Sequence, residues 1–143
     1  MKSKVILLVE DNPDDEVLTL RALKKCHVAN PIVVVRDGAE ALDWLYRRGA
    51  HAARDPALEP QLILLDLNLP KIDGLGVLKA IRGDASLQRM PIVMLTSSNE
   101  DVDVIESYKL GANSYVCKPV GFEPFAKAVQ QLGLYWLVLN EQR

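Results

Sequence analysis

Short apolar runs, separated by segments of helical periodicity, constrain the fold of this 143-residue chain more than any other feature. A continuous apolar run of about four to eight residues is typical of a strand buried on both faces of a parallel sheet. Strands that alternate with helices imply right-handed crossovers and helices on both faces of the sheet. The sequence therefore predicts a doubly wound α/β fold, with strands at residues 5–9, 32–35, 62–66, 91–95 and 114–117.

The segments between these runs carry helix signals. A first helix is expected from about Pro13, because proline suits the first helical turn and the acids at residues 14–16 favour its positive end. Asn99 is a fair N-cap for a later helix. Residues 47–60 have no periodicity, and we expect a long exposed loop there, either functional or mobile. Apolar spacing predicts further helices at residues 39–46, 75–81, 99–110 and 122–140.

The composition is that of an ordinary globular chain, with 49% hydrophobic and 25% charged residues, and its length fits one domain. The net charge of -2 and the lack of a Lys/Arg stripe argue against nucleic-acid binding. No apolar run approaches the about 20 residues of a membrane span. Cys26 and Cys117 have neither metal-ligand nor redox spacing, so free thiols and a cytoplasmic location are expected.

Polar residues whose side chains could bind a ligand or take part in a reaction follow four of the predicted strands. In open parallel sheets, ligands bind beyond the carboxyl ends of the strands, so these side chains should meet at one edge. Each has a plainer interpretation as a turn residue, a solvated acid, a strand-end hydroxyl or a surface cation. Their joint occurrence favours a site. The residues, in chain order, are Glu10, Asp11, Asp66, Thr96 and Lys118.

Carboxylates crowded at one edge repel one another and stay ionised only if a cation joins them. Oxygen ligands suit Mg²⁺, which commonly uses one or two carboxylates and accepts phosphate oxygens, whereas zinc and copper would favour His or Cys. The Asp66 carboxylate can attack phosphorus to form an acyl phosphate. Lys118 and the metal would then offset negative charge, while Thr96 donates a hydrogen bond. The pattern thus points to phosphoryl chemistry.

Taken together, these motifs resemble the receiver domains of two-component response regulators. The resemblance covers essentially the whole chain. It implies a flavodoxin-like five-stranded sheet of order 2-1-3-4-5, with residues 1–143 forming a single receiver domain. Because the chain ends at Arg143, no output domain is expected, and the output should be protein binding. The motifs are Val9-Glu10-Asp11, Leu65 to Pro70, Asp73-Gly74, Met94 to Ser97, Gly111-Ala112 and Lys118-Pro119.

The resemblance implies that Asp66 accepts a phosphoryl group from a histidine kinase, and that Lys118 and Thr96 contact that group. It also implies a switch in which Thr96 moves toward the phosphoryl group and Tyr115 turns inward. This movement would remodel the surface formed by the fourth helix, fifth strand and fifth helix. A Tyr115 with no switching role is the plainer alternative. A cis Lys118-Pro119 bond is implied as well.

The resemblance also assigns a metal site. It implies that Glu10, Asp11, Asp66 and the main-chain carbonyl of Asn68 hold Mg²⁺. Glu10 stands where many members of the family have Asp, a departure that bears on how this acid reaches the metal through water. The phosphorylation function should survive this difference.

The last predicted helix is apolar nearly all round. A helix of this kind is buried on more than one side, and an exposed apolar patch usually marks an interface. We expect a homodimer through this helix and the adjoining strand. The alternative is a tail that folds back on its own domain. The interface residues expected are Phe125, Leu134, Tyr135 and Val138.

Three details resemble a narrower group, the single-domain regulators paired with cyanobacterial-type phytochrome kinases. They are the opening at residues 10–15, the long loop before Leu62 and the ending at residues 132–137. This resemblance implies a phytochrome-type sensor histidine kinase as partner and a light-regulated phosphorelay.

Two rival functions remain open. The first is a magnesium phosphohydrolase resembling haloacid-dehalogenase phosphatases, which usually carry a second Asp two residues after the nucleophile. Here Asn68 occupies that place and cannot act as a general acid. The second is a degenerate receiver that only binds partners, against which the intact acids argue. We therefore expect a signalling protein rather than an enzyme, with slow loss of the phosphoryl group and with Asn68 and Ser98 able to influence the attacking water.

Overall fold

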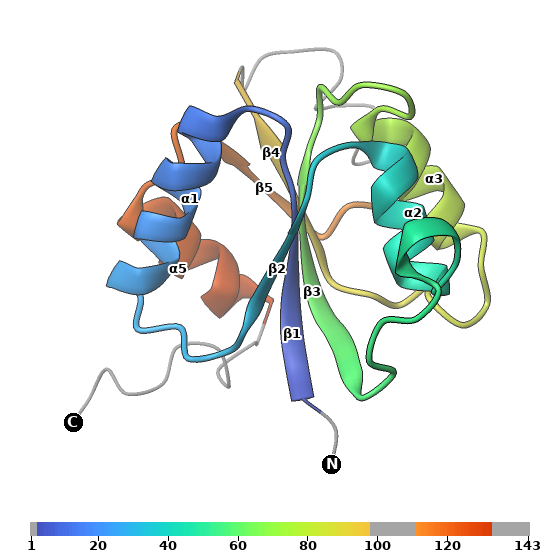
Figure 1. Ribbon diagram of the computed structural model, residues 1–143. Helices are drawn as coiled ribbons and strands as arrows, with labels where there is room; N and C mark the ends of the chain where they lie inside the picture. The colour runs from blue at the N-terminus through green and yellow to red at the C-terminus, as the bar shows by residue number, and fades with distance from the viewer. Residues whose placement is uncertain (1–2, 98–110, 133–143) are drawn as a thin grey trace.

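A five-stranded parallel sheet runs through the centre of the computed structural model, which describes residues 3–97 and 111–132 (Figure 1). The strand order is β2-β1-β3-β4-β5, and every neighbouring pair is parallel. This confirms the predicted fold class and order. The strands are β1 (Ser3–Val9), β2 (Ile32–Val35), β3 (Leu58–Asp66), β4 (Ile92–Thr96) and β5 (Ser114–Cys117).

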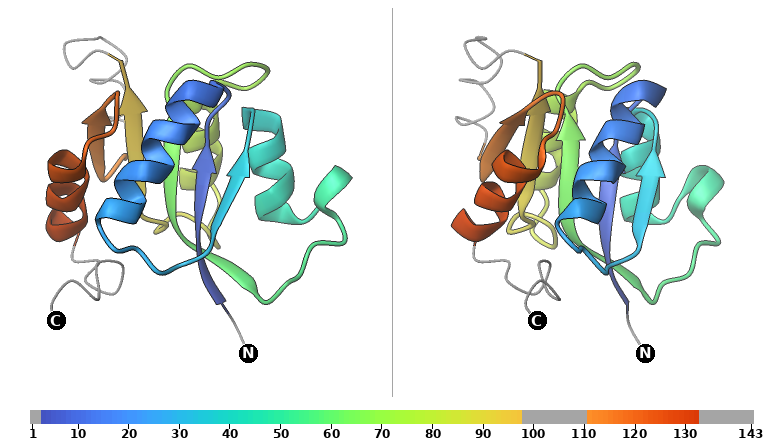
Figure 2. Two further views of the ribbon diagram at one scale, coloured as in Figure 1. Left: turned by 60° about the vertical axis from the view of Figure 1, so that its left-hand side comes forward. Right: turned by 90° about the vertical axis from the view of Figure 1, so that its left-hand side faces the viewer.

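Helices cover both faces of this sheet. Helices α1 and α5 lie on one side, and α2 and α3 lie on the other (Figures 1 and 2). None of the helices in the described ranges is long and apolar enough to cross a bilayer. The helices are α1 (Pro13–Lys25), α2 (Gly38–Tyr46), α3 (Gly74–Arg82) and α5 (Phe122–Gln131).

Two separate cores result from the alternation of side chains along the strands. In β1, Ile6 and Leu8 pack in the core beneath α1 and α5, whereas Leu7 and Val9 pack in the core beneath α2 and α3. All of these side chains are fully buried, as expected for the central strand of a covered parallel sheet. The same alternation decides which face a polar residue occupies where a strand ends.

Side-chain caps fix the points at which three helices begin. The Asn12 carboxamide oxygen accepts hydrogen bonds from the main-chain N–H groups of Asp14 and Asp15, at 2.9 and 3.0 Å, at the start of α1. Asp37 and Asp73 cap α2 and α3 in the same way. Such a cap contributes about 1 kcal/mol. The three caps hold the first turns of these helices in place.

Gly74, the first residue of α3, lies against the main chain that follows β3. Its N–H donates to the Leu67 carbonyl at 3.0 Å. A β-carbon at Gly74 would overlap the Asp66 carbonyl and the Leu67 backbone. Glycine is therefore required for this close approach.

The prediction of a long loop at residues 47–60 was wrong in part. A short 3₁₀ helix, η1, covers Gly49–His51, and β3 already begins at Leu58. The first residues of β3 pair with β1 before a register shift that follows Val5. Pro60 interrupts the apolar pattern but is tolerated, because β4 pairs with β3 only from Ile63 onward and leaves that side open.

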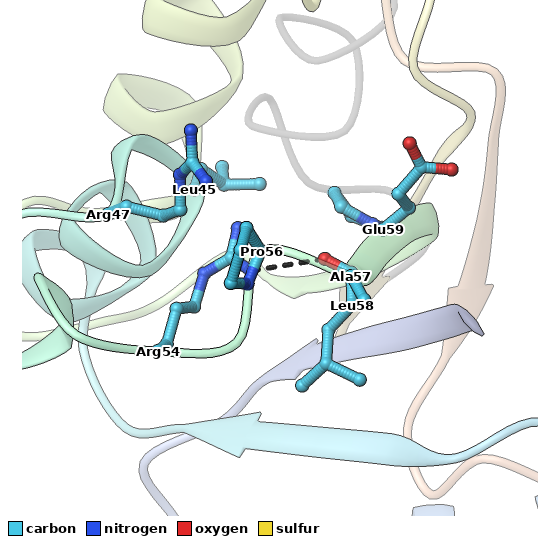
Figure 3. A pocket seen from close by; sticks show the side chains of 8 residues that line it. Leu45, Arg47, Arg54, Pro56, Ala57, Leu58 and Glu59 are labelled. Atoms are coloured by element: carbon cyan, nitrogen blue, oxygen red, sulfur yellow. Dashed lines mark hydrogen bonds between the residues drawn. The ribbon is translucent and has the colours of Figure 1, made fainter. Parts of the chain in front are cut away.

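Arg54 holds this connection in place. Its guanidinium stacks on Trp44 of α2, 3.8 Å from the ring centroid, and its Nε donates to the Trp44 carbonyl at 2.7 Å. Its Nη1 donates to the carbonyls of Asp55 and Leu58, each at 3.0 Å. Figure 3 shows Arg54 beside Leu58 in the shallow pocket that this connection forms. The pocket lies at the amino-terminal end of β3, at the opposite end of the strand from Asp66.

The expectations for the last helix have mixed outcomes. Phe125 is 0% exposed and packs in the core beneath α1 and α5, so its assignment to an interface was wrong. The amphipathic stripe of α5 faces its own sheet at this position. The other expected interface residues, Leu134, Tyr135 and Val138, lie outside the described residues, as does the helix expected at 99–110.

Candidate functional site

The carboxyl ends of the central strands are level with one another. Val9 pairs with Leu65, Leu65 with Met94, and Met94 with Tyr115, so one row of residues crosses four strands. The residues that follow this row emerge at the same edge of the sheet (Figure 2). The structure therefore brings the predicted site residues together, as the strand ends indicated.

Three acids gather at this edge. Glu10, Asp11 and Asp66 each offer a carboxylate oxygen, and these oxygens lie within 4.8 Å of one another. Glu10 and Asp66 are buried, whereas Asp11 is exposed. Glu10 Oε1 is buried and accepts no hydrogen bond, although it forms an ion pair. A buried oxygen in an all-oxygen cluster fits a hard divalent cation such as Mg²⁺ or Mn²⁺.

Glu10 is strongly affected by its surroundings. Burial, together with a hydrogen bond to Asp66 and the charge of that carboxylate, raises the pKa of Glu10 to about 7. The Asn12 N–H, which donates to Glu10 Oε2 at 3.2 Å, and the charge of Lys118 act in the opposite direction. Near neutral pH Glu10 is therefore partly protonated, and a divalent cation would displace this proton.

Lys118 follows β5 and joins the acids to helix α1. Its Nζ lies 3.1 Å from Glu10 Oε1, 3.1 Å from Asp66 Oδ2 and 3.0 Å from Asp15 Oδ2. Burial lowers the pKa of Lys118, but the hydrogen bond to Asp15 and the charges of Asp66 and Glu10 outweigh it, so the net shift is upward. The ammonium is therefore charged and surrounded by carboxylates.

The remaining predicted residues lie on β4, on β5 and in the segment that follows β3. Thr96 ends β4 and is buried, and its carbonyl accepts the Lys118 N–H at 2.7 Å. The Asn68 N–H donates to Asp66 Oδ1 at 3.2 Å. Tyr115 is half-buried and packs against the core beneath α2 and α3. The Lys118-Pro119 bond is cis, as the resemblance implied.

Asp15 is the residue of this site that the sequence analysis missed. It was interpreted only as an acid at the positive end of a helix. A usable signal existed, because Glu10 and Asp66 continue the alternation of residues that face α1 and α5, as Leu8 and Leu64 do. An acid in the first turn of the helix covering that face lies above them.

Comparison with known proteins agrees with this geometry. A family model described as the response regulator receiver domain matches residues 6–130. The response regulator Rcp1 of Synechocystis sp. is 41% identical over 94% of this chain and 89% of its own length. A crystal structure of its Mn²⁺-bound form has a TM-score of 0.76, with 40% identity over 95% of this chain and 96% of that chain.

Two further solved structures are similar to this chain. The bacteriophytochrome response regulator AtBRR is 53% identical, covers 98% of this chain and 99% of its own, and has a TM-score of 0.87. The phosphorylated cyanobacterial phytochrome response regulator RcpA is 38% identical, covers 100% and 98%, and has a TM-score of 0.73. The chain therefore belongs to the response regulator receiver domain family and is similar to its phytochrome-associated members.

Proposed function

We propose that Asp66 accepts a phosphoryl group from a sensor histidine kinase in a Mg²⁺-dependent reaction, and that the signal passes on through protein binding. The observation that carries this proposal is the position of the Lys118 ammonium, 3.1 Å from Asp66 Oδ2 and beside the acidic cluster. A carboxylate next to a fixed cation and a metal-binding cluster suits an incoming phosphoryl group.

The transfer itself is a displacement at phosphorus. An Asp66 carboxylate oxygen forms the new P–O bond while the P–N bond of the kinase phosphohistidine breaks, and the histidine nitrogen keeps that electron pair and takes up a proton. Lys118 directs one N–H donor to a phosphoryl oxygen, and the Thr96 hydroxyl donates to another. These donors offset negative charge that the buried carboxylate alone would repel.

The cation would be held by Glu10, Asp11, Asp66 and the Asn68 main-chain carbonyl. When bound, it supplies positive charge beside the transferring oxygens. The buried Glu10 Oε1, which accepts no hydrogen bond, and the all-oxygen ligand set support this assignment. The Mn²⁺-bound form of Rcp1 is consistent with a divalent metal.

The relatives suggest the partner. Because AtBRR is described as a bacteriophytochrome response regulator and RcpA as a cyanobacterial phytochrome response regulator, a phytochrome-type kinase is the proposed donor. Phosphorylation would draw Thr96 toward the new group and turn Tyr115 inward. The half-buried position of Tyr115 at the end of the sheet is compatible with two orientations.

We further propose a homodimer and a cytoplasmic location. The free thiols of Cys26 and Cys117 are compatible with a reducing compartment. The dimer proposal rests on the apolar sequence beyond residue 132. A monomeric mass by light scattering at micromolar concentration, with and without an acyl-phosphate mimic, would contradict it.

Incubation with Mg²⁺ and acetyl phosphate, followed by intact-protein mass spectrometry, tests the central proposal. The parent should gain one phosphoryl group and lose it slowly, Asp66→Asn should gain none, and Asp14→Asn should be labelled like the parent. Equal labelling of Asp66→Asn would contradict the proposal. Sustained multiple-turnover hydrolysis of small phosphate esters would instead favour a phosphatase.

A further inference from the structure

The three N–H donors of the Lys118 ammonium face three carboxylates, and only two of these belong to the phosphoryl and metal site. The third is Asp15, whose Oδ2 lies 3.0 Å from Nζ. We propose that Asp15 is a positioning residue, which restrains Lys118 and thereby sets both the metal affinity of the site and its rate of phosphoryl acceptance. This inference rests on the proposed function.

The contact is fixed from both sides. The Asp15 N–H donates to the Asn12 side chain at 3.0 Å, and the Asn12 N–H donates to Glu10 Oε2 at 3.2 Å. The first turn of α1 is thus hydrogen-bonded to the acidic cluster. The side chains of Lys118 and Asp15 are only 12% and 27% exposed. Partial burial reduces solvent screening, so this ion pair is stronger than an exposed pair.

Asp15 influences metal binding through Lys118. Without the Asp15 charge, the ammonium would keep only Glu10 and Asp66 as partners, and both are proposed metal ligands. Mg²⁺ can bind these two carboxylates only if it replaces part of their interaction with the Lys118 ammonium. Because Asp15 attracts the ammonium away from them, its removal should weaken Mg²⁺ binding.

Asp15 influences phosphoryl acceptance in the opposite direction. The hydrogen bond from Lys118 to Asp15 occupies one N–H donor of the ammonium that would otherwise be available to a phosphoryl oxygen. The Asp15 charge also repels an approaching phosphate dianion. Once the metal is saturating, removal of this charge should therefore accelerate phosphoryl acceptance.

The simpler view is that Asp15 only stabilises the positive end of α1, as first-turn acids do. Asp14 provides a matched control, since it lies in the same turn, also donates its N–H to Asn12, and is exposed. Among the described residues, its carboxylate pairs with no cation. Asp14→Asn and Asp15→Asn change the net charge and the helix terminus equally, but only Asp15→Asn removes the ion pair to Lys118.

The experiment uses the full chain as parent, Asp14→Asn, Asp15→Asn and Asp15→Glu. Titration calorimetry gives the Mg²⁺ dissociation constant, and acetyl phosphate at saturating Mg²⁺ gives the second-order labelling rate. We expect Asp15→Asn to weaken Mg²⁺ binding by about three- to tenfold and to raise the labelling rate by about threefold or more. Asp14→Asn should change either quantity by less than about twofold, and Asp15→Glu should return both toward the parent values.

Equal effects of Asp15→Asn and Asp14→Asn on both quantities would overturn the inference, as would failure of Asp15→Glu to restore them. Weaker Mg²⁺ binding without faster labelling would also overturn it, because the restraint must act on both. If the parent itself is not labelled, the proposed function fails. The Mg²⁺ dissociation constants still test the inference about Asp15 separately. Equal constants for Asp14→Asn and Asp15→Asn would overturn that inference.

Discussion

Two cations in this molecule occupy comparable, partly buried positions at opposite ends of β3, yet they have different kinds of partner. Arg54 donates to main-chain carbonyls and stacks on Trp44. Lys118 faces three carboxylates, one on α1, one at the end of β3 and one in the segment between β1 and α1. The carbonyl partners of Arg54 are neutral and fixed, so its contacts stabilise one arrangement.

Under the proposed function, the carboxylates that face Lys118 can be protonated, bound by metal or phosphorylated. Every such change alters the balance of charge around the ammonium, because the pairs are shielded from water. A fully satisfied cation therefore supports structure, whereas a cation shared among competing anions supports a response. Three substitutions or conditions test this contrast.

Substitution of Lys118 should have the largest effect. Lys118→Met removes the donor beside Asp66 and leaves Glu10 and Asp15 without their shared cation. We expect the rate of phosphoryl acceptance from acetyl phosphate to fall by about 100- to 1000-fold, as for removal of one preorganised donor. Time-resolved mass spectrometry at saturating Mg²⁺ measures this rate. A variant labelled within about threefold of the parent would show that the ammonium has no role in the transfer.

Substitution of Arg54 should lower the stability of the protein and leave phosphoryl acceptance nearly unchanged. Arg54→Met removes three hydrogen bonds to carbonyls and should lower the free energy of unfolding by about 2 kcal/mol, while labelling at Asp66 stays within about twofold of the parent. Urea denaturation measures the stability. The contrast fails if Arg54→Met slows phosphoryl acceptance while the protein remains folded.

The smallest expected effect is the pH dependence of metal binding. The pKa of Glu10 is raised from 4.5 to about 7, so protons and Mg²⁺ compete for it below neutrality. Apparent Mg²⁺ affinity should fall by up to about tenfold between pH 7 and pH 6 and level off above pH 8. Glu10→Gln should bind Mg²⁺ more weakly and lose this slope, which calorimetry at several pH values detects.

The same shift predicts the opposite sign for the stability of the metal-free protein. The folded chain holds the Glu10 proton up to about pH 7, whereas the unfolded chain releases it near 4.5. The metal-free fold should therefore gain stability from this group as the pH falls from 7 toward 4.5. Glu10→Gln provides the control, and an unchanged pH dependence in that variant would assign the effect to another group.

Most of the sheet could be predicted from the sequence, because central strands need side chains that are apolar on both faces. The start of β3 could not, since Pro60 and Glu59 lie where only one neighbour pairs and the apolar requirement relaxes. The apolar stripe of α5 also misled. Phe122 is 45% exposed while Phe125 is 0% exposed, and the pattern does not distinguish them.

The residues of the site also fall into those that the sequence predicted and one that it did not. Acids that directly follow strands were predictable, because strand register brings them to one edge. Asp15 was not recognised, because its contact depends on which helix covers the face of the sheet that Glu10 and Asp66 occupy. The alternation along the strands indicates that face, but the position of the helix above it comes from the packing.

The close contact at Gly74 prevents the Asp66 backbone from moving toward α3. Helix α3 begins against the main chain of Asp66 and Leu67 and leaves no space for even one additional carbon. Under the proposed function, movement of the Asp66 backbone toward α3 could not make room for a phosphoryl group, because this contact leaves no space. We therefore expect the displacement on the side of β4 and β5, at Thr96, which ends β4, and at Lys118, which follows β5. In that case a residue without a side chain would determine which half of the domain responds.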